Sequence, residues 1–215
     1  MSVSLPNGAI VAIASGYGSA LTVSVVTNAN PAVATSTAHG LSNADYVEVT
    51  SGWSRLTNKI VRVANVTANT FEIEGYDTTS TTIYPAAAGT GSVRKITGFT
   101  QITQILTSSS SGGDQQFATY QFLEADAETR IPTSKAAAGL TLSIADDSTL
   151  AGYIIASTAN DDRLKRAVRI TLASAAKLLY NSYVSVDKTP SLSVNNIMAV
   201  NMTLSHLNEP VRYST

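Results

Sequence analysis

The last third of the chain changes from the two-residue hydrophobic period of strands to the longer period of a helix, and then back. Side chains alternate between the faces of a strand, whereas one face of a helix recurs every third or fourth residue. This pattern predicts strands over Leu140–Ile144, Arg166–Leu172, Lys177–Val186 and Val194–Leu204, and a helix over Ser148–Thr158. One face of the last strand is expected to hold Met198, Val200, Met202 and Leu204.

Local signals define the start of the predicted helix. Asp146-Asp147-Ser148 is typical of an N-cap, because short polar side chains accept hydrogen bonds from the first free N–H groups and acids favour the positive end of the helix dipole. Gly152 lowers helix stability, so we expect it to allow close packing on a sheet. The apolar stripe is expected at Leu150, Ala151, Ile154, Ile155 and Thr158.

Residues 19–93 have a different pattern, with short apolar runs separated by turn residues. Such regular spacing is typical of a small all-β barrel or sandwich. We expect Trp53 to pack in its core. The expected strands are Leu21–Val26, Ala32–Ser36, Tyr46–Val49, Lys59–Val66, Thr70–Glu74 and Thr81–Tyr84.

The N-terminal residues predict an arm over Met1–Asn7 and a strand over Ala9–Ala14, which a turn at Ser15–Gly18 ends. We therefore predict two domains. Residues 1–18 and 94–215 form one β-rich domain, and residues 19–93 form a small β domain inserted into it.

A low-complexity segment, Thr107–Asp114, lies in the middle of the chain. Serine and glycine runs bury little surface and have a large backbone entropy, so this segment is predicted to be a mobile loop. Strands are expected on both sides of it, over Gly98–Leu106 and Gln115–Leu123.

The composition favours a structural protein. Charged residues make up 13% of the chain, against about 25% in a typical domain, and the net charge is −1. Because there are no cysteines, disulfides, thiolate catalysis and cysteine-based zinc sites are excluded. The sequence shows no positively charged signal-peptide start and no apolar stretch of the roughly 20 residues that a membrane span needs.

No residues form a recognisable catalytic, cofactor-binding or metal-binding pattern, so we expect no enzyme activity and no cofactor. Asp146 and Asp147 are expected to cap the helix, and His39, beside Gly40, is expected to have a structural role. The alternative to a structural role is a module that binds a cell surface or a carbohydrate. Its aromatic platform would consist of Tyr17, Trp53, Tyr76 and Tyr84.

The order of elements over Leu140–Leu204 resembles the core of the tail tube (major tail) proteins of long-tailed bacteriophages. In addition, Ala38–Val49 followed by Val66–Ile73 is similar to a small β-module of phage virion proteins. The resemblance implies a mainly β fold, a two-sheet β-sandwich or barrel with one flanking α-helix. It also implies stacked hexameric rings in the virion tail. These rings would be assembled in the bacterial cytoplasm, and no membrane would be a partner. Double-stranded DNA passes through the rings, and the partners are tape-measure, terminator and baseplate proteins.

Three sets of residues are hypothesised to serve this assembly. An inter-ring loop would consist of Ser108, Ser109, Ser110, Ser111, Gly112, Gly113 and Asp114. A second set would consist of acids that face the lumen of the rings, namely Asp114, Glu124, Asp126 and Glu128. Their carboxylates would repel the phosphates of the DNA and let the DNA slide. Ring-closing strands, which would pair with neighbouring copies, would contribute Gln115, Phe117, Tyr120, Phe122, Val200 and Met202.

Overall fold

The computed structural model describes residues 7–214, and its fold is mainly β, with 49% strand and 6% helix. The predicted fold class is thus confirmed. Of the arm expected over Met1–Asn7, only Asn7 lies within the described residues. The elements are β1 (Ile10–Val23), β2 (Val25–Val26), β3 (Ala32–Thr35), β4 (Tyr46–Ser51), β5 (Ile60–Ala64), β6 (Thr70–Ile73), β7 (Gly91–Ile102), β8 (Ile105–Ser111), β9 (Gln115–Tyr120), β10 (Thr129–Lys135), β11 (Gly139–Ala145), α1 (Ala151–Asp162), β12 (Arg166–Thr171), β13 (Lys177–Val186), β14 (Ala199–His206) and β15 (Val211–Tyr213).

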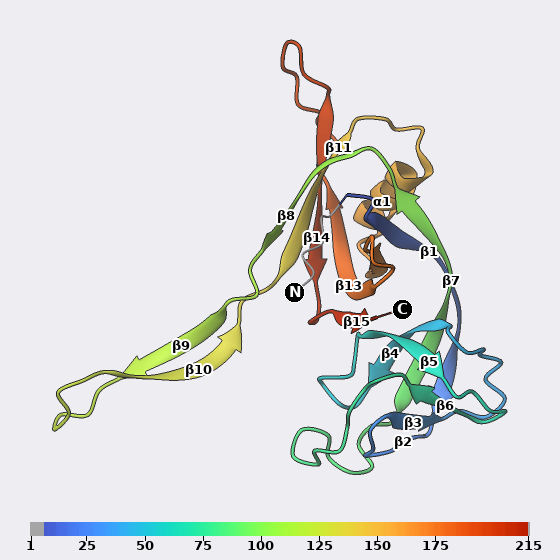
Figure 1. The fold of residues 1–215 in the computed structure, drawn as a ribbon, viewed down its shortest axis with the longest axis vertical. Coiled ribbons are helices and arrows are strands. Elements are labelled where there is room, and N and C mark those ends of the chain that lie inside the picture. The colour runs from blue at the N-terminus through green and yellow to red at the C-terminus, as the bar shows by residue number, and fades with distance from the viewer. Residues whose placement is uncertain (1–6, 215) are drawn as a thin grey trace.

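Nearly all strands belong to one 13-stranded sheet. Its order is β2-β3-β6-β5-β4-β7-β1-β12-β13-β14-β11-β8, with β15 paired to β13. The strands β9 and β10 form a separate two-stranded sheet. In Figure 1 the strands β11 to β14 and α1 form the upper part of the molecule, β2 to β6 form the lower part, and β9–β10 project to one side.

The upper core lies between the sheet and α1. Its fully buried side chains include Ile13, Leu142, Val168, Met202 and Leu204. The prediction that Val200, Met202 and Leu204 share a buried face is confirmed. Met198 is half exposed, because β14 begins only at Ala199 and the expected strand over Val194–Met198 does not form.

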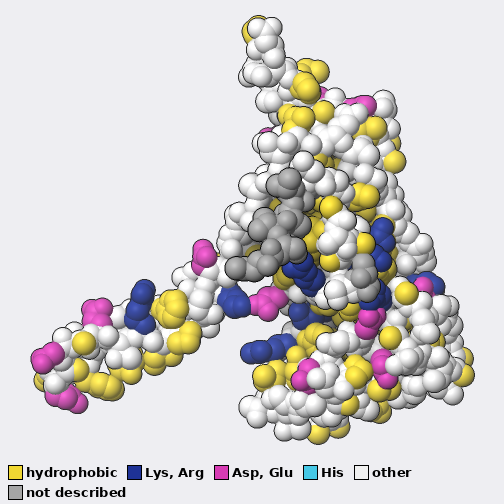
Figure 2. Space-filling model, viewed as in Figure 1, with side chains coloured by type: hydrophobic (Ala, Val, Ile, Leu, Met, Phe, Trp, Pro, Cys, Tyr) yellow, Lys and Arg dark blue, Asp and Glu magenta, His cyan; other side chains and the backbone are white. Residues whose placement is uncertain are grey.

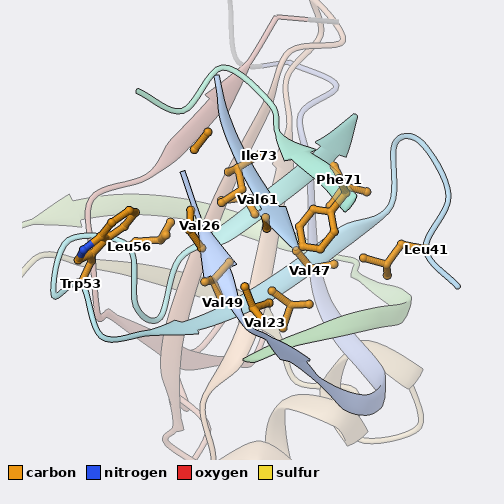
Figure 3. Packing of buried hydrophobic residues seen from close by; sticks show 14 of the residues in the cluster. Val23, Val26, Leu41, Val47, Val49, Trp53, Leu56, Val61, Phe71 and Ile73 are labelled. Carbon is orange, nitrogen blue, oxygen red and sulfur yellow. The ribbon is translucent and has the colours of Figure 1, made fainter. Parts of the chain in front are cut away.

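The lower core belongs to what we call the lower β unit, which consists of β2 to β6 and the adjoining parts of β1 and β7. Figure 3 shows Trp53 and Leu56 at one end of this core and Phe71 and Leu41 at the other. Trp53 is buried here, as predicted. Residues 81–84 are not a strand, so that expectation was wrong.

Two long strands connect the two cores. β1 pairs with β7 from Val11–Ile102 to Val23–Gly91, with register irregularities between Ala14 and Ala20. The turn expected at Ser15–Gly18 was therefore wrong, because these residues lie within β1 and the irregularities absorb the change of direction. Both strands cross the predicted domain boundaries, at residues 18/19 and 93/94. The division into residues 19–93 and the rest therefore stays a prediction.

The helix begins later than expected and buries a different face. The Asp147 carboxylate accepts hydrogen bonds from the backbone N–H and hydroxyl of Thr149, and the N-cap residue is Leu150, without a side-chain cap. The buried face consists of Gly152, Ala156 and Ala159. The predicted stripe was wrong for Ala151, Ile154 and Thr158, which are exposed, whereas Ile155 does pack against the upper core. The small residues of the buried face let α1 approach the sheet closely. A Cβ at position 152 would lie 2.6 Å from the Gln101 carbonyl oxygen, so the expected role of Gly152 is confirmed.

The serine-rich segment is mostly a strand. Thr107–Ser111 belong to β8, whose backbone pairs with β11 from Ser111–Gly139 to Ile105–Ile144. The prediction of a loop over Thr107–Asp114 was wrong for Thr107–Ser111. Backbone hydrogen bonds to a partner strand can hold a strand in a sheet even when its own side chains are small and polar. The expected strand Gly98–Leu106 is interrupted at Thr103 and Gln104.

Candidate assembly surfaces

The hairpin β9–β10, which we call the projecting hairpin, extends away from the body of the protein (Figure 1). All of its residues from Gln116 to Lys135, apart from Ala125, are exposed. Figure 2 shows hydrophobic side chains along it, over a length where no other element covers them. The large exposed apolar residues are Phe117, Tyr120, Phe122, Leu123 and Ile131. Because an isolated two-stranded hairpin is marginally stable in water, this arrangement indicates an interaction surface.

The base of the projecting hairpin is held by specific contacts. The Ala136 N–H donates to the Asp114 carbonyl oxygen at 2.8 Å, and Lys135 forms an ion pair with Glu209. Gly112 has a φ of +71°, and a Cβ there would lie 1.9 Å from the Ala137 carbonyl oxygen. Only glycine fits this position, so the chain enters the hairpin through a fixed turn.

Three of the acids hypothesised to face the lumen lie together, and the fourth does not. Glu124, Asp126 and Glu128 are exposed in the turn that connects β9 to β10. Asp114 lies at the opposite end of β9. Arg130, the nearest cation in sequence, stacks over the Phe117 ring at 5.1 Å. The end of the projecting hairpin is thus both acidic and apolar.

The strands expected to close rings differ in their pairing. Gln115, Phe117 and Tyr120 lie in β9, and Phe122 lies just beyond it, on the projecting hairpin. β14, however, pairs with β13 on one side and β11 on the other, and its Val200 and Met202 are buried in the upper core. The assignment of these two residues to a ring-closing strand was therefore wrong, because an interior strand has no free backbone groups to offer.

The strand at one end of the sheet is instead β8. Among residues 7–214 it pairs with β11 only, and it carries no charged side chain. Unprotected edge strands without charges readily pair with another chain. The residues Ser108–Ser111, predicted to be a loop, thus present a backbone edge.

A second exposed apolar segment was not recognised in the sequence. The connection Asp187–Met198, which we call the apical loop, exposes Leu192, Val194 and Ile197. The strand pattern over Val194–Leu204 concealed it, because Val194 and Met198 lie on the same alternate positions as Val200 and Met202, although Ile197 does not. Turn-forming Asn195-Asn196, in the middle of the segment, was the signal that separates loop from strand.

A hollow of about 530 Å³, which we call the basal hollow, lies at the base of the projecting hairpin. Its apolar lining residues are Ala136, Ala137, Ala138, Leu140, Leu207 and Pro210. Tyr180 and His206, whose rings stack at 4.2 Å, also contribute to it.

A buried polar cluster joins the two cores. The Glu48 carboxylate, only 3% exposed, accepts hydrogen bonds from Asn181 at 2.8 Å and from Arg94, and it forms an ion pair with Lys165 at 2.8 Å. Burial alone would raise the pKa of Glu48, but the hydrogen bonds from these three residues outweigh it and hold the pKa below its usual value. The lower β unit is therefore fixed on the upper core by a charged group.

Of the residues of the alternative aromatic platform, Trp53 and Tyr84 are buried, and Tyr17 and Tyr76 are partly buried. Trp53 donates from Nε1 to the Pro85 carbonyl oxygen at 2.8 Å and contacts the Tyr84 ring edge-on, and Tyr84 contacts Tyr76. Tyr17 lies elsewhere, where its hydroxyl accepts a hydrogen bond from the Ala167 N–H. The four rings form no common surface, and no observation favours the alternative function.

The histidines have structural contacts. His39 is buried, accepts a hydrogen bond from the Leu41 N–H at Nδ1 and lies edge-on to Phe71, as its expected role requires. Among residues 7–214, no three His, Asp or Glu side chains gather in a way that could hold a metal ion. In the same range, no helix is long and apolar enough to cross a membrane.

Comparison with known proteins gives one family. A family model described as phage tail tube protein matches residues 51–215. No curated protein sequence matches the chain.

Similar solved structures come from tail and injection assemblies. One is the tail of an empty gene transfer agent particle with C6 symmetry, at 11% identity over 54% of this chain and 88% of that chain, with a TM-score of 0.44. Another is the tube-terminating cap of the anti-feeding prophage, at 19% identity over 54% and 83%, with a TM-score of 0.37. A third is the sheath-tube complex of an extracellular contractile injection system, at 15% identity over 50% and 80%, with a TM-score of 0.36.

Proposed function

The chain belongs to the phage tail tube protein family, and on this premise we propose that six copies close into a ring and that rings stack into a tube for double-stranded DNA. Its role in the tail is structural. The partners beyond its own copies would be the tape-measure, terminator and baseplate proteins at the ends of the tube, and assembly would take place in the bacterial cytoplasm.

The projecting hairpin is the observation that carries this proposal. Phe122 is 61% exposed, and Leu123 beside it is fully exposed. A single chain gains nothing from holding these side chains in water at the end of a thin hairpin, and contiguous exposed apolar surface of this kind marks a binding site. A neighbouring copy that covers the hairpin would stabilise both its apolar residues and its fold.

The free edge of β8 supports ring closure. A strand of a neighbouring copy would supply the missing partners for the backbone groups of Ile105–Ser111. The hairpin and the β8 edge are different surfaces, so each copy would use one surface toward one neighbour and the other surface toward the other neighbour. Such a heterologous contact gives a ring when the rotation that relates successive copies brings the last copy back to the first. The serines of β8 would then act through their backbone within the ring, in place of the inter-ring loop that the sequence predicts.

The acidic turn of the projecting hairpin fits a lumen that does not retain DNA. Glu124, Asp126 and Glu128 add negative charge to one exposed turn. Phosphate groups bind cationic side chains and are repelled by carboxylates. If this turn reaches the lumen, the genome passes without being held.

The test is assembly of the purified protein and of a hairpin variant. At high concentration the wild-type chain should form rings and tubes in electron micrographs. Replacing Phe122 and Leu123 by serine should leave a folded monomer, because both side chains are exposed. Light scattering gives the mass, and thermal unfolding shows that the variant is folded.

The matched control is Leu164→Ser. Leu164 is 58% exposed in the turn between α1 and β12, away from the hairpin, and its variant should assemble like the wild type. A wild-type chain that stays monomeric at every concentration and salt tested would overturn the proposal. Tubes of normal yield from the hairpin variant would overturn the role of the hairpin.

A further inference from the structure

The apical loop is ordered although its tip is apolar and exposed. Leu192, Val194 and Ile197 are 78%, 89% and 67% exposed. The Ser191 N–H donates to the Ala199 carbonyl oxygen at 2.9 Å, and the Asn196 N–H donates to that of Ser193 at 3.2 Å. The loop is thus a closed turn at the upper end of the molecule (Figure 1), and its three large apolar side chains are exposed.

The tip of the loop is also uncharged. Residues 189–198 contain no Asp, Glu, Lys or Arg. A surface that receives this tip must be apolar and close to neutral, because an unpaired charge would lose its water without gaining a partner. This requirement excludes the acidic turn of the projecting hairpin.

The basal hollow meets this requirement. Its apolar lining consists of the alanines at 136–138 with Leu140, Leu207 and Pro210, and the uncharged Ser110, Ser111 and Asn208 also line it. The two side chains of opposite charge that line it, Lys135 and Glu209, form an ion pair with each other, so they cancel. At about 530 Å³ the hollow lies within the range of roughly 300–1,000 Å³ that is usual for sites that enclose small apolar groups.

The loop and the hollow lie at opposite ends of the same strand. β14 begins at Ala199, directly after the apical loop, and ends at His206, which lines the hollow. Since a strand advances by about 3.3 Å per residue, the tip of one chain cannot reach its own hollow. Copies placed end to end along this strand bring each tip to the hollow of the next copy, and such a head-to-tail contact repeats without closing.

We propose that the apical loop of one copy inserts Leu192, Val194 and Ile197 into the basal hollow of a copy in the next ring. This inference rests on the proposed stacking of rings and assigns the residues that hold successive rings together. The exposed end of the projecting hairpin and the outer backbone edge of β8 are left to contacts within the ring, whereas Lys135 at the hairpin base and Ser110 and Ser111 of β8 line the hollow.

The absence of cysteine from the chain allows a direct test by disulfide trapping. A variant with Val194→Cys and Ala137→Cys, assembled and then oxidised, should give a ladder of covalent oligomers on a non-reducing gel. The ladder should continue past six copies, because the links run along the tube. Mixing the two single variants should give a covalent dimer and no larger species.

The control variant combines Val194→Cys with Ser80→Cys, on the exposed surface of the lower β unit. It should give no ladder. A ladder that ends at six copies would place the loop in a neighbour of the same ring and would overturn the inference. The inference would also be overturned if the variant with Val194→Cys and Ala137→Cys formed normal tubes but gave no ladder.

A second variant tests the same contact without cysteine. Replacing Leu192, Val194 and Ile197 by serine should leave thermal unfolding unchanged, because all three side chains are exposed. We expect separate rings and at least a tenfold loss of tube length in electron micrographs. Tubes of wild-type length would overturn the inference and leave the proposed function standing, whereas a wild-type chain without rings would overturn the proposed function itself.

Discussion

Glu48 on β4 and Asn181 on β13 are joined by a hydrogen bond of 2.8 Å, and both side chains are almost completely buried. This bond connects the lower β unit to the upper core. Lys165 and Arg94 complete the cluster around the same carboxylate. A charge so far from water persists only with such partners.

Glu48→Gln should destabilise the protein. The amide keeps the size of the side chain but loses the charge that Lys165 and Arg94 contact. We expect a loss of about 2 kcal/mol in the free energy of unfolding, the usual scale for hydrogen bonds to charged groups. Urea unfolding measures it. Glu72→Gln, on β6, is the control and should change the free energy by no more than about 0.5 kcal/mol.

Stability should also depend on pH through Glu48. Its pKa is lowered in the folded protein from an ordinary value of 4.5, so its contribution is complete above that pH and is lost as the pH falls through the lower folded value. The melting temperature of the wild type should therefore fall more steeply below this pH than that of Glu48→Gln. Parallel curves for the two proteins would contradict the assignment.

Gly152→Ala should lower stability although alanine is the better helix former. The added methyl group would lie 2.6 Å from the Gln101 carbonyl oxygen and 3.0 Å from the Ile102 Cα atom. Overpacking of this kind costs about 1–3 kcal/mol, more than the roughly 1 kcal/mol of helix propensity gained. Thr158→Ala, on the exposed side of α1, is the control and should be close to neutral in the same melting experiment.

Met202→Asp should prevent folding or reduce stability by about 3–5 kcal/mol, because it places an unpaired charge in the upper core. Asn201→Asp changes the neighbouring exposed residue on the opposite face of β14. It should give soluble, folded protein. Equal soluble yields of the two variants would contradict the burial of Met202.

The acidic turn gives a prediction about DNA. Tubes in which Glu124, Asp126 and Glu128 are replaced by lysine should retain double-stranded DNA in a sedimentation assay, and wild-type tubes should not. Each new phosphate contact should add about 0.9 to the slope of log affinity against log salt. Glu72→Lys, on the lower β unit, is the control. Equal retention by wild-type and lysine tubes would show that the turn does not face the DNA.

The sequence predicts those parts of the fold in which one face of a strand is buried. The bounds of β13 were predicted as observed, and those of β12 and β11 to within one residue at either end, because each alternates in a regular way. β8 was missed since its ladder depends on β11, which is distant in sequence, and not on its own side chains. The other residues of the helix face were mispredicted because hydrophobicity alone does not show that the small side chains of Ala156 and Ala159 face the sheet.

The assembly surfaces were predicted only in part. The pattern identified the apolar residues of β9 but not the partner strand β10, whose polar and proline-containing sequence reads as a loop. Val200 and Met202 were assigned to an open strand because a sequence shows which residues are apolar but not which strand edges are already paired.

The continuity of β1 and β7 has a mechanical consequence. Their ladder of paired residues runs from Val11–Ile102 to Val23–Gly91, so two continuous strands, and not a linker, join the lower β unit to the upper core, in addition to the Glu48 cluster. A pull along these strands is carried by the chain itself and loads in shear the backbone hydrogen bonds between β1 and β12, and no slack segment extends first. Strain applied to the far end of the lower β unit would therefore be transmitted directly to the sheet under α1.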